Sequence, residues 1–183
     1  MLEPFDLNLR HLRALGSVVE LRSLNRSAEA AGLSQPALTQ GIAKLERQLG
    51  ARLFDRHSGG VVPTAAGLAL AERARRAFAC LSLKGQRQGR SGLRGFSRPE
   101  QLMTAMQLKA FLHFAEAQGF AGAAATSGIS QPGVHRAVRE LEQISGHALA
   151  ERRGRGMMLT PAGQAMARAM RLAAAEIAAG IAE

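Results

Sequence analysis

A cluster of polar side chains between positions 34 and 49 has the chemistry to bind a nucleic acid. Gln40, Lys44 and Arg47 recur at the spacing of one helical face, with Gln35 and Thr39 beside them. Together they offer amide, hydroxyl and cationic groups with almost no carboxylate. The other side of the same helix carries an apolar stripe at the spacing i, i+4, i+7 and i+11, formed by Leu38, Ile42, Leu45 and Leu49. We therefore predict a short helix with one buried side and one polar side suited to nucleic acid.

The residues before this helix predict how it begins and what precedes it. Ser34 is a favourable N-cap, and Pro36 falls in the first helical turn, where its missing N–H group costs nothing. Residues 27–33 have the pattern of a helix of barely two turns that Gly32 ends, since glycine readily adopts the left-handed conformation. Two short helices joined by a tight turn that contains glycine form a helix-turn-helix. The alternative, on spacing alone, is an ordinary helical hairpin inside a bundle.

The same pattern occurs twice in the chain, at an offset of 96 positions that aligns Ser130 with Ser34. Between Leu12 and Gly67 this offset gives 17 identical residues in 56 positions without a gap. A high content of alanine and glycine does not explain matches at Ser, Gln, Pro, Leu and Glu in a fixed order. We therefore interpret the chain as two copies of one module.

The elements around the polar helix complete each module. Residues 7–21 have the apolar pattern of a first helix, which we expect to pack behind the helix-turn-helix. After Gly50, residues 51–63 predict two short strands around a turn, a hairpin of the kind called a wing. Residues 65–83 predict a further helix with a narrow apolar seam, which usually pairs with another helix. The seam consists of Leu68, Ala71, Ala74 and Phe78.

The predicted fold is therefore mainly α-helical, with two tandem winged helix-turn-helix modules, each followed by a long linker helix suited to dimerisation. Residues 1–84 form the first module, 85–102 a basic linker rich in glycine and serine, and 103–183 the second module. The formal net charge of +10 and the isoelectric point near 11.5 favour a polyanionic partner. Residues 83–99 contain five basic residues and no acidic one, which indicates either a strand along phosphates or a solvated linker.

The sequence argues against several other functions. Cys80 is the only cysteine, so we expect no internal disulfide, and neither it nor the five histidines show the spacing of metal ligands. No nucleophile, base and orienting acid stand in a catalytic pattern, so we expect no enzyme and no cofactor. The first residues are not a signal peptide, and Glu176 interrupts the one long apolar tail before it could span a membrane. Without Trp or Tyr for base stacking, duplex DNA is the expected partner.

Several motifs of the first module occur together in a fixed order. They are Ser34-Gln35-Pro36-Ala37-Leu38-Thr39, Leu45-Glu46, Leu49-Gly50, Arg52-Leu53-Phe54-Asp55-Arg56 and Thr64-Ala65-Ala66-Gly67, with Leu12, Glu20, Ala28 and Ile42 between or before them. With these motifs, residues 7–84 resemble the winged helix-turn-helix of LysR-type bacterial transcriptional regulators. Residues 103–183 resemble the same module, with an especially good match at Leu159-Thr160-Pro161-Ala162-Gly163.

The resemblance implies that helix 35–49 enters a major groove, that the wing touches neighbouring backbone or minor groove, and that the helix after Thr64 forms an antiparallel dimer. Major-groove bases are read by side chains with paired donors and acceptors, so we expect Gln35, Thr39 and Gln40 at base edges. The family often has arginine at the position of Gln40, which implies a different base or weaker binding. The other residues expected at DNA in this repeat are Ser34, Pro36 and Ala37 at the helix start, and Arg26, Lys44 and Arg56 at phosphates.

In repeat two the corresponding recognition helix is 131–145, and its role is open to two interpretations. Either both copies contact DNA, or the second is a degenerate copy kept for dimerisation, because Gly122 stands at the position of Arg26 and Ala150 at that of Phe54. If it binds DNA, the expected contact residues are Ser130, Gln131, Pro132, His135, Arg136, Arg152, Arg153 and Arg155.

Two hypotheses concern assembly and function. If helices 64–83 and 160–179 pair with each other, the chain is its own pseudo-dimer and reads two unlike half-sites, whereas a true two-fold dimer favours palindromic sites. LysR-type regulators normally continue into a large ligand-sensing domain that nothing here resembles, so a small-molecule effector is expected only with such a domain. The alternative function is a sensorless interaction module that pairs with related regulators through its linker helices and binds DNA weakly. In either case we expect a cytoplasmic, nucleoid-associated bacterial protein.

Overall fold

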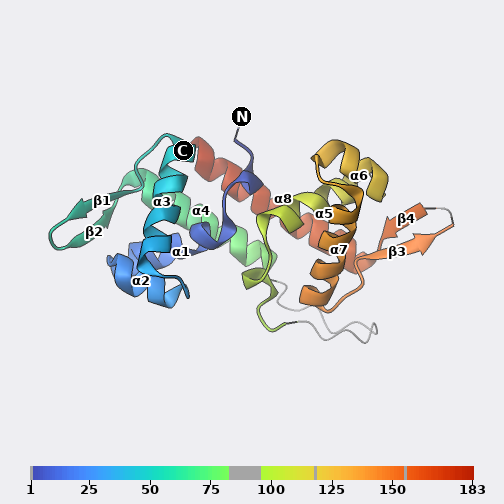
Figure 1. Ribbon diagram of the computed structural model, residues 1–183, viewed down its shortest axis with the longest axis horizontal. Helices are drawn as coiled ribbons and strands as arrows, with labels where there is room; N and C mark the ends of the chain where they lie inside the picture. Colours follow the sequence, from blue (N-terminus) through green and yellow to red (C-terminus); the bar gives the residue numbers. More distant parts are fainter. Residues whose placement is uncertain (1, 83–95, 118, 155) are drawn as a thin grey trace. The chain divides into compact units, whose positions relative to one another are not determined.

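The computed structural model describes residues 2–82, 96–117, 119–154 and 156–183 (Figure 1). They divide into two compact units, Met1–Ala79 with Ala173–Glu183 and Cys80–Leu172. The helices and strands are, in chain order, α1 (Leu9–Leu21), α2 (Leu24–Ala30), α3 (Gln35–Leu49), β1 (Phe54–His57), β2 (Gly60–Pro63), α4 (Ala65–Leu81), α5 (Ala105–Ala117), α6 (Phe120–Ser127), α7 (Gln131–Ser145), β3 (Ala150–Arg153), β4 (Gly156–Leu159) and α8 (Pro161–Ala182). Short 3₁₀ turns at Pro4–Asp6 and Pro99–Gln101 precede α1 and α5.

A side-chain cap defines the start of α1. The Asn8 carboxamide oxygen accepts hydrogen bonds from the backbone N–H groups of Arg10 at 2.9 Å and His11 at 3.2 Å. The helix therefore begins two residues after the predicted position 7. It ends where Arg22 adopts the left-handed conformation, with φ at 49°.

Caps also define the helix-turn-helix, which is confirmed. Ser23 caps α2, so the short helix begins three residues before the predicted span and ends at Ala30. Gly32 lies in the turn with φ at +61°, a conformation that glycine adopts without strain. The Ser34 hydroxyl caps α3, and Gly50 ends that helix with φ at 66°, as the sequence predicts.

The core of the first module lies between α1, α2 and α3. The apolar stripe of α3 is buried as predicted, apart from its half-buried last member. The one buried polar side chain among these helices, Ser27, donates a 3.0 Å hydrogen bond to the carbonyl oxygen of Ser17, so its hydroxyl is satisfied. The apolar core residues are Leu12, Leu15, Val18, Ala28, Leu38, Ile42 and Leu45.

The predicted wing is the antiparallel hairpin β1–β2, in which Phe54 faces Pro63 and His57 faces Gly60. It is fixed to α3 by a carboxylate. Glu46 accepts hydrogen bonds from the backbone N–H groups of Leu53 at 2.9 Å and Phe54 at 3.3 Å. Because both of those residues are buried, the wing is held at one position on α3.

The threonine and glycine of the motif at 64–67 connect the wing to α4. The Thr64 hydroxyl donates to the carbonyl oxygens of Arg52 at 2.7 Å and Leu53 at 3.1 Å, and it accepts from the N–H of Gly67 at 3.0 Å. A Cβ at Gly67 would lie 2.0 Å from the Leu53 carbonyl oxygen, so this close approach requires glycine. The motif is thus explained by its structural role.

The second module repeats these contacts at the corresponding positions. Glu142 accepts from the N–H groups of Leu149 at 2.9 Å and Ala150 at 3.3 Å, and the Thr160 hydroxyl donates to the Ala148 carbonyl oxygen at 2.6 Å. A Cβ at Gly163 would lie 2.0 Å from the Leu149 carbonyl oxygen, the same distance as in the first module. The two winged helix-turn-helix modules therefore share one architecture, as the internal repeat predicts.

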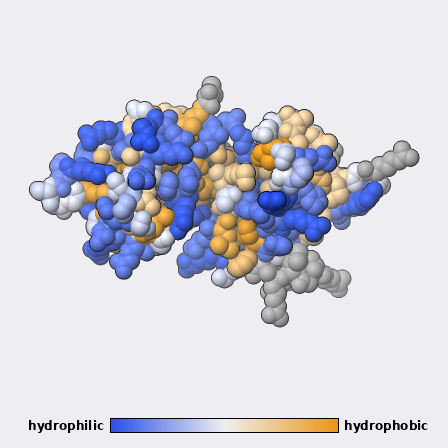
Figure 2. All heavy atoms as spheres, in the orientation of Figure 1, coloured by the Kyte–Doolittle hydropathy of each residue, from blue (hydrophilic) through white to orange (hydrophobic). Residues whose placement is uncertain are grey.

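The core of the second module is more aromatic than that of the first. Phe111 and Phe114 of α5 are buried, and the Phe114 ring stacks on Phe120, with centroids 4.7 Å apart. Helix α6 consists mainly of small residues and buries only Ala123. The surface over α6 is coloured toward the hydrophobic end in Figure 2.

The buried face of α4 differs from the predicted seam. Leu68 was predicted to belong to it but is 49% exposed, and Leu70 is buried instead. Phe78 is half-buried with the Arg13 guanidinium 4.4 Å from its ring centroid, so it faces α1. The face that is buried consists of Leu70, Ala71, Ala74, Ala77 and Leu81.

Candidate nucleic-acid interface

The polar side of α3 is open to solvent in the first module. Gln35, Gln40 and Lys44 are exposed, and Thr39 is half-buried. The Gln35 amide donates a 3.3 Å hydrogen bond to the Thr39 hydroxyl, which restricts the orientation of the amide. Hydrophilic residues cover most of the visible surface around α3 (Figure 2). The predicted reading residues are thus together on one helical surface.

The residues at the starts of α3 and α7 shape those helices. The Ser34 hydroxyl accepts the N–H of Ala37 at 3.3 Å, and the Ser130 hydroxyl accepts the N–H of Gly133 at the same distance. Pro36 is exposed, and Ala37 is half-buried. Since the two hydroxyls cap helices, their first effect is to fix the positive helix N-terminus, which attracts anions.

Cationic side chains surround α3. Arg26 on α2 and Arg56 on β1 are exposed, and so are Arg47, which was predicted on the polar face of α3 but not among the DNA contacts, and Arg10, which was not predicted. Arg10 donates a 2.6 Å hydrogen bond to the carbonyl oxygen of Gly32, in the turn between α2 and α3. The helical spacing of Arg47 was a usable signal, whereas the place of Arg10 depends on how α1 packs.

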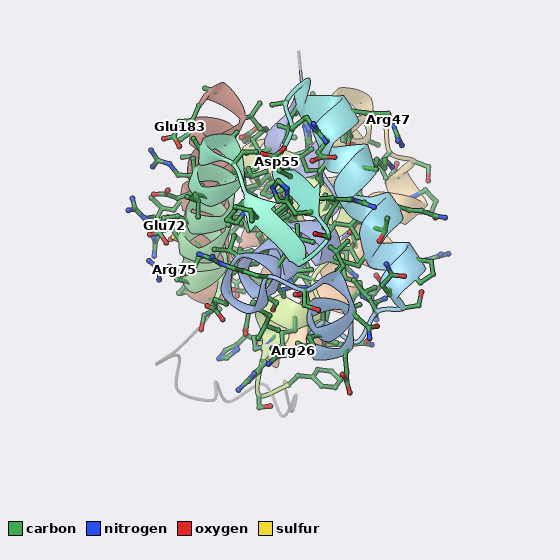
Figure 3. All side chains as sticks on the ribbon, turned by 90° about the vertical axis from the view of Figure 1, so that its left-hand side faces the viewer. Arg26, Arg47, Asp55, Glu72, Arg75 and Glu183 are labelled. Carbon is green, nitrogen blue, oxygen red and sulfur yellow. The ribbon has the colours of Figure 1, made fainter. Side chains whose placement is uncertain are left out.

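The labelled side chains of Figure 3 separate two surfaces of the first unit. Arg47 lies with α3 on one side, whereas Glu72, Arg75 and Glu183 lie with α4 and the end of α8 on the other. A ligand bound along α3 would therefore leave the α4 surface free.

His11 supports α3 from behind this charged surface. Its ring lies against Gly41, where a Cβ would come within 2.6 Å of the imidazole. Burial lowers the pKa of His11 below its ordinary value of 6.5, and the nearby charges of Lys44 and Arg10 lower it further. The imidazole is therefore neutral at pH 7, and the positive charge of the surface resides in the outer lysine and arginines.

The polar side of α7 presents different groups. Gln131, Pro132, His135 and Arg136 are all exposed. The His135 ring lies 4.8 Å from the ring of Phe120, at the start of α6. Phe120, Gln131, Pro132 and His135 line an open hollow of about 420 Å³. The second module thus combines amide, imidazole and guanidinium groups with an aromatic surface.

The charges around α7 also differ from those around α3. Glu140 occupies the position of Lys44 and accepts a 2.7 Å hydrogen bond from the Gln107 amide. Arg136 takes the position of Gln40, and Arg139 is a further exposed cation one turn along the same face, which sequence analysis did not include. The cations of the second module therefore lie closer to the start of its helix.

The second wing carries exposed arginines. Arg152 and Arg153 lie on β3, and Arg153 forms a 3.1 Å ion pair with Glu151 whose side chains are both well exposed. Arg155 lies outside the described residues, as do residues 85–95 of the predicted basic linker 85–102. The described part of the wing thus offers two cations for contacts to a backbone.

The described part of the chain holds no group of three or more His, Cys, Asp or Glu side chains that could bind a metal ion. Over the same residues, no helix is both long and apolar enough to cross a lipid bilayer.

The model of the bacterial regulatory helix-turn-helix proteins of the LysR family matches residues 9–68 and again 106–164. The HTH-type transcriptional regulator CbbR of Sinorhizobium medicae is 53% identical over 70 residues, which make up 38% of this chain and 22% of that protein. The regulator GalR of Pseudomonas putida is 35% identical over 159 residues, which make up 85% of this chain and 38% of that protein. This chain thus spans well under half the length of these relatives.

No solved structure matches the chain. The two family matches cover both modules and more than half of the residues. The chain therefore belongs to the LysR family of bacterial regulatory helix-turn-helix proteins.

Proposed function

We propose that the chain is a transcriptional regulator that binds double-stranded DNA in a sequence-specific manner through both modules. The observation that carries the proposal is the pair of capped helices α3 and α7, each with one buried apolar side and one exposed polar side. An α-helix fits the major groove of B-DNA, where each base pair displays a distinct pattern of donors and acceptors. In this proposal residues 35–49 and 131–145 are the recognition helices, within modules that span residues 1–84 and 103–183.

In the first module, Gln35 and Gln40 supply the amides that read base edges. A glutamine amide both donates and accepts, so it pairs with the N6 and N7 atoms of adenine. The hydrogen bond from Gln35 to Thr39 supports this role, because it orients the amide before DNA binds. Pro36 and Ala37 offer apolar contacts to a thymine methyl group at the same end of the helix.

Phosphate contacts hold the first module on the duplex. Arg26, Lys44 and Arg56 are exposed cations on three different elements, so they can reach phosphates on both sides of α3. The capped N-terminus of α3 adds backbone N–H groups and the positive end of a helix dipole. This set supplies affinity without sequence information.

In the second module, Gln131, His135 and Arg136 read a different sequence. Arginine binds guanine through its O6 and N7 atoms, whereas the corresponding residue of the first module is Gln40. The exposed arginines of the second wing, Arg152 and Arg153, and Arg155 next to them in the sequence, would contact backbone. The two modules therefore prefer unlike half-sites.

The test is a measurement of duplex binding against salt, with a target selected from random sequence and a scrambled duplex. Gln35→Ala and Arg136→Ala are each expected to relax discrimination, at different half-sites, by about 1–3 kcal/mol. Lys44→Ala is expected to weaken binding equally on all sequences. It is also expected to reduce the slope of log affinity against log salt concentration by about one.

Arg171→Ala is the matched control, because it removes an exposed cation from α8, outside the proposed interface. It is expected to leave discrimination unchanged. Binding that is weak, indifferent to sequence and unaffected by the two base-reading substitutions would overturn the proposal. The chain would then act as an interaction module that pairs with related regulators.

A further inference from the structure

We infer that α4 and the end of α8 of one chain pair with each other in solution, so that a single chain carries the complete two-module reading unit. That this unit reads an asymmetric DNA site rests on the proposed function. The pairing itself does not.

The two helices approach each other closely at Gly180. A Cβ at this position would lie 3.0 Å from the Cβ of Arg73 and 3.0 Å from Cδ1 of Leu70, which is tighter than ordinary side-chain contact. Glycine costs about 1 kcal/mol relative to alanine inside a helix. Its place in α8 is therefore explained by the contact with α4.

Both helices also carry a buried apolar face beside these residues. Ala173 and Ile177 precede Gly180 at the spacing of one helical face, and both are fully buried. On α4, Leu70, Ala74 and Ala77 have the same spacing and are also buried. Small side chains on both faces allow the helices to pack closely.

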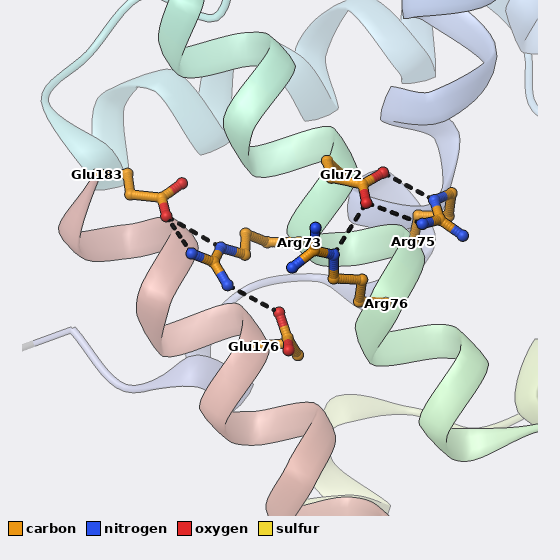
Figure 4. Close-up of polar contacts among 6 residues, drawn as sticks. All are labelled: Glu72, Arg73, Arg75, Arg76, Glu176 and Glu183. Carbon is orange, nitrogen blue, oxygen red and sulfur yellow. Dashed lines mark hydrogen bonds and ion pairs between the residues drawn. The ribbon is translucent and has the colours of Figure 1, made fainter.

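Ion pairs connect the outer edge of the same contact (Figure 4). Arg73 donates to Glu176 at 3.1 Å, and its Nε donates to Glu183 at 3.0 Å, so one guanidinium connects two carboxylates of α8. The side chains of Arg73 and Glu176 are each only 28% exposed, so the pair is better shielded than a surface salt bridge. These contacts fix the register of α8 on α4.

The consequence concerns symmetry. Because Gly180 occupies the space beside Leu70 and Arg73, and Glu176 and Glu183 pair with Arg73, a second chain cannot use this part of α4 for a two-fold dimer while α8 is paired. A two-fold dimer presents identical reading helices and favours palindromic sites. One chain with α3 and α7 instead presents two different helices in a fixed order. It is expected to read a bipartite site with unlike halves and to bind it in one direction.

A disulfide tests the pairing without DNA. Arg73→Cys and Gly180→Cys are combined with Cys80→Ser, since Cβ atoms in disulfides lie about 3.5–4.5 Å apart and these two positions are close to that range. After oxidation at micromolar concentration, the protein is expected to migrate on a non-reducing denaturing gel as a single chain, slightly faster than the reduced protein. Light scattering of the unmodified protein is expected to give a mass of 19.4 kDa at all concentrations.

The control pairs Gly180→Cys with Arg75→Cys, because Arg75 is exposed and pairs with Glu72 on its own helix. It is expected to form no internal disulfide. Disulfide-linked double chains, a doubled mass, or equal cross-linking in the control would each overturn the inference, and so would the absence of any disulfide in the test variant.

Measurements with duplex DNA distinguish this inference from the proposed function. Native mass spectrometry with the selected duplex is expected to show one chain per duplex, and inversion of one half-site is expected to lower affinity at least tenfold, about 1.4 kcal/mol. An internal disulfide without sequence-specific binding would support the pairing and overturn the function. Sequence-specific binding by pairs of chains linked by disulfides would support the function and overturn the pairing within one chain.

Discussion

The carboxylate of Glu46 accepts the backbone N–H of Leu53 at 2.9 Å, and Glu142 accepts that of Leu149 at 2.9 Å in the second module. The Leu-Glu motif near the end of α3 and of α7 therefore holds the wing of its module. This motif of the family therefore makes a structural contact within each module.

Removal of this carboxylate is expected to destabilise the first module. Glu46→Ala leaves the N–H groups of the buried Leu53 and Phe54 without their acceptor, which costs roughly 1–3 kcal/mol. Glu46→Gln keeps an oxygen at the same place and is expected to lose less. Denaturant unfolding followed by circular dichroism measures both variants, and equal losses would contradict the hydrogen-bonding role.

Two glycines of the first module are expected to respond oppositely to alanine. At Gly67 a Cβ would meet the Leu53 carbonyl oxygen at 2.0 Å, so the wing must shift, at a cost of about 1–3 kcal/mol or more. At Gly16, inside α1, no atom lies within 4 Å of a Cβ, so alanine is expected to stabilise by up to about 1 kcal/mol. Thermal unfolding of the two variants makes the comparison, and changes of the same sign would contradict it.

A fall in pH is expected to lower the free energy of unfolding through protonation of Glu72 on α4. Hydrogen bonds from Arg75 and then Arg76 lower the pKa of Glu72 from 4.5 to about 2 (Figure 4). Since the folded-state pKa is the lower one, this contribution to stability is fully present above pH 4.5 and is lost as the pH falls toward 2. Glu72→Gln removes the titration, so its unfolding free energy is expected to depend less steeply on pH in that window. Parallel profiles for the variant and the unmodified protein would rule this out.

The hollow beside α7 leads to a prediction about bases, on the basis of the proposed function. Phe120 and His135 present an apolar surface next to Gln131, and aromatic side chains contact the methyl group of thymine. Replacement of thymine by deoxyuridine in the second module's half-site is expected to weaken binding about fourfold, the value of one buried methyl group. Phe120→Leu introduces the residue at the corresponding position of the first module, Leu24, and is expected to remove that difference. An equal loss in both proteins would exclude Phe120 from thymine recognition.

Sequence alone predicted the parts of the fold that local chemistry determines. Ser34, Gly32 and Gly50 have strong positional preferences at helix ends and turns, and the stripe from Leu38 to Leu45 has one unambiguous period. The bounds of α3 and its polar face could therefore be predicted to the residue. The strand and turn pattern of residues 51–63 predicted the wing.

The residues that make contacts between distant segments could not be predicted in this way, even where the pairing of two helices, 64–83 and 160–179, was a hypothesis. Helix α4 is rich in alanine, so its apolar pattern fits several faces, and the choice between Leu68 and Leu70 depends on which helix packs against it. The hollow of the second module brings together Phe120 and His135 from two helices, which no spacing rule links. For the same reason the ion pairs of Arg73 were not predicted, since their partners lie more than a hundred positions away.

The distance along the chain between α4 and its partner also affects how the protein is made. Arg73 leaves the ribosome 103 residues before Glu176 and 110 before Glu183. At roughly 5–20 residues per second, the apolar face of α4 lacks its own partner for about 5–20 s. During that interval the α8 segment of a neighbouring nascent chain can occupy it, because the contacts are the same. We therefore expect closely spaced ribosomes on one message to favour pairs of chains that have exchanged their α8 segments.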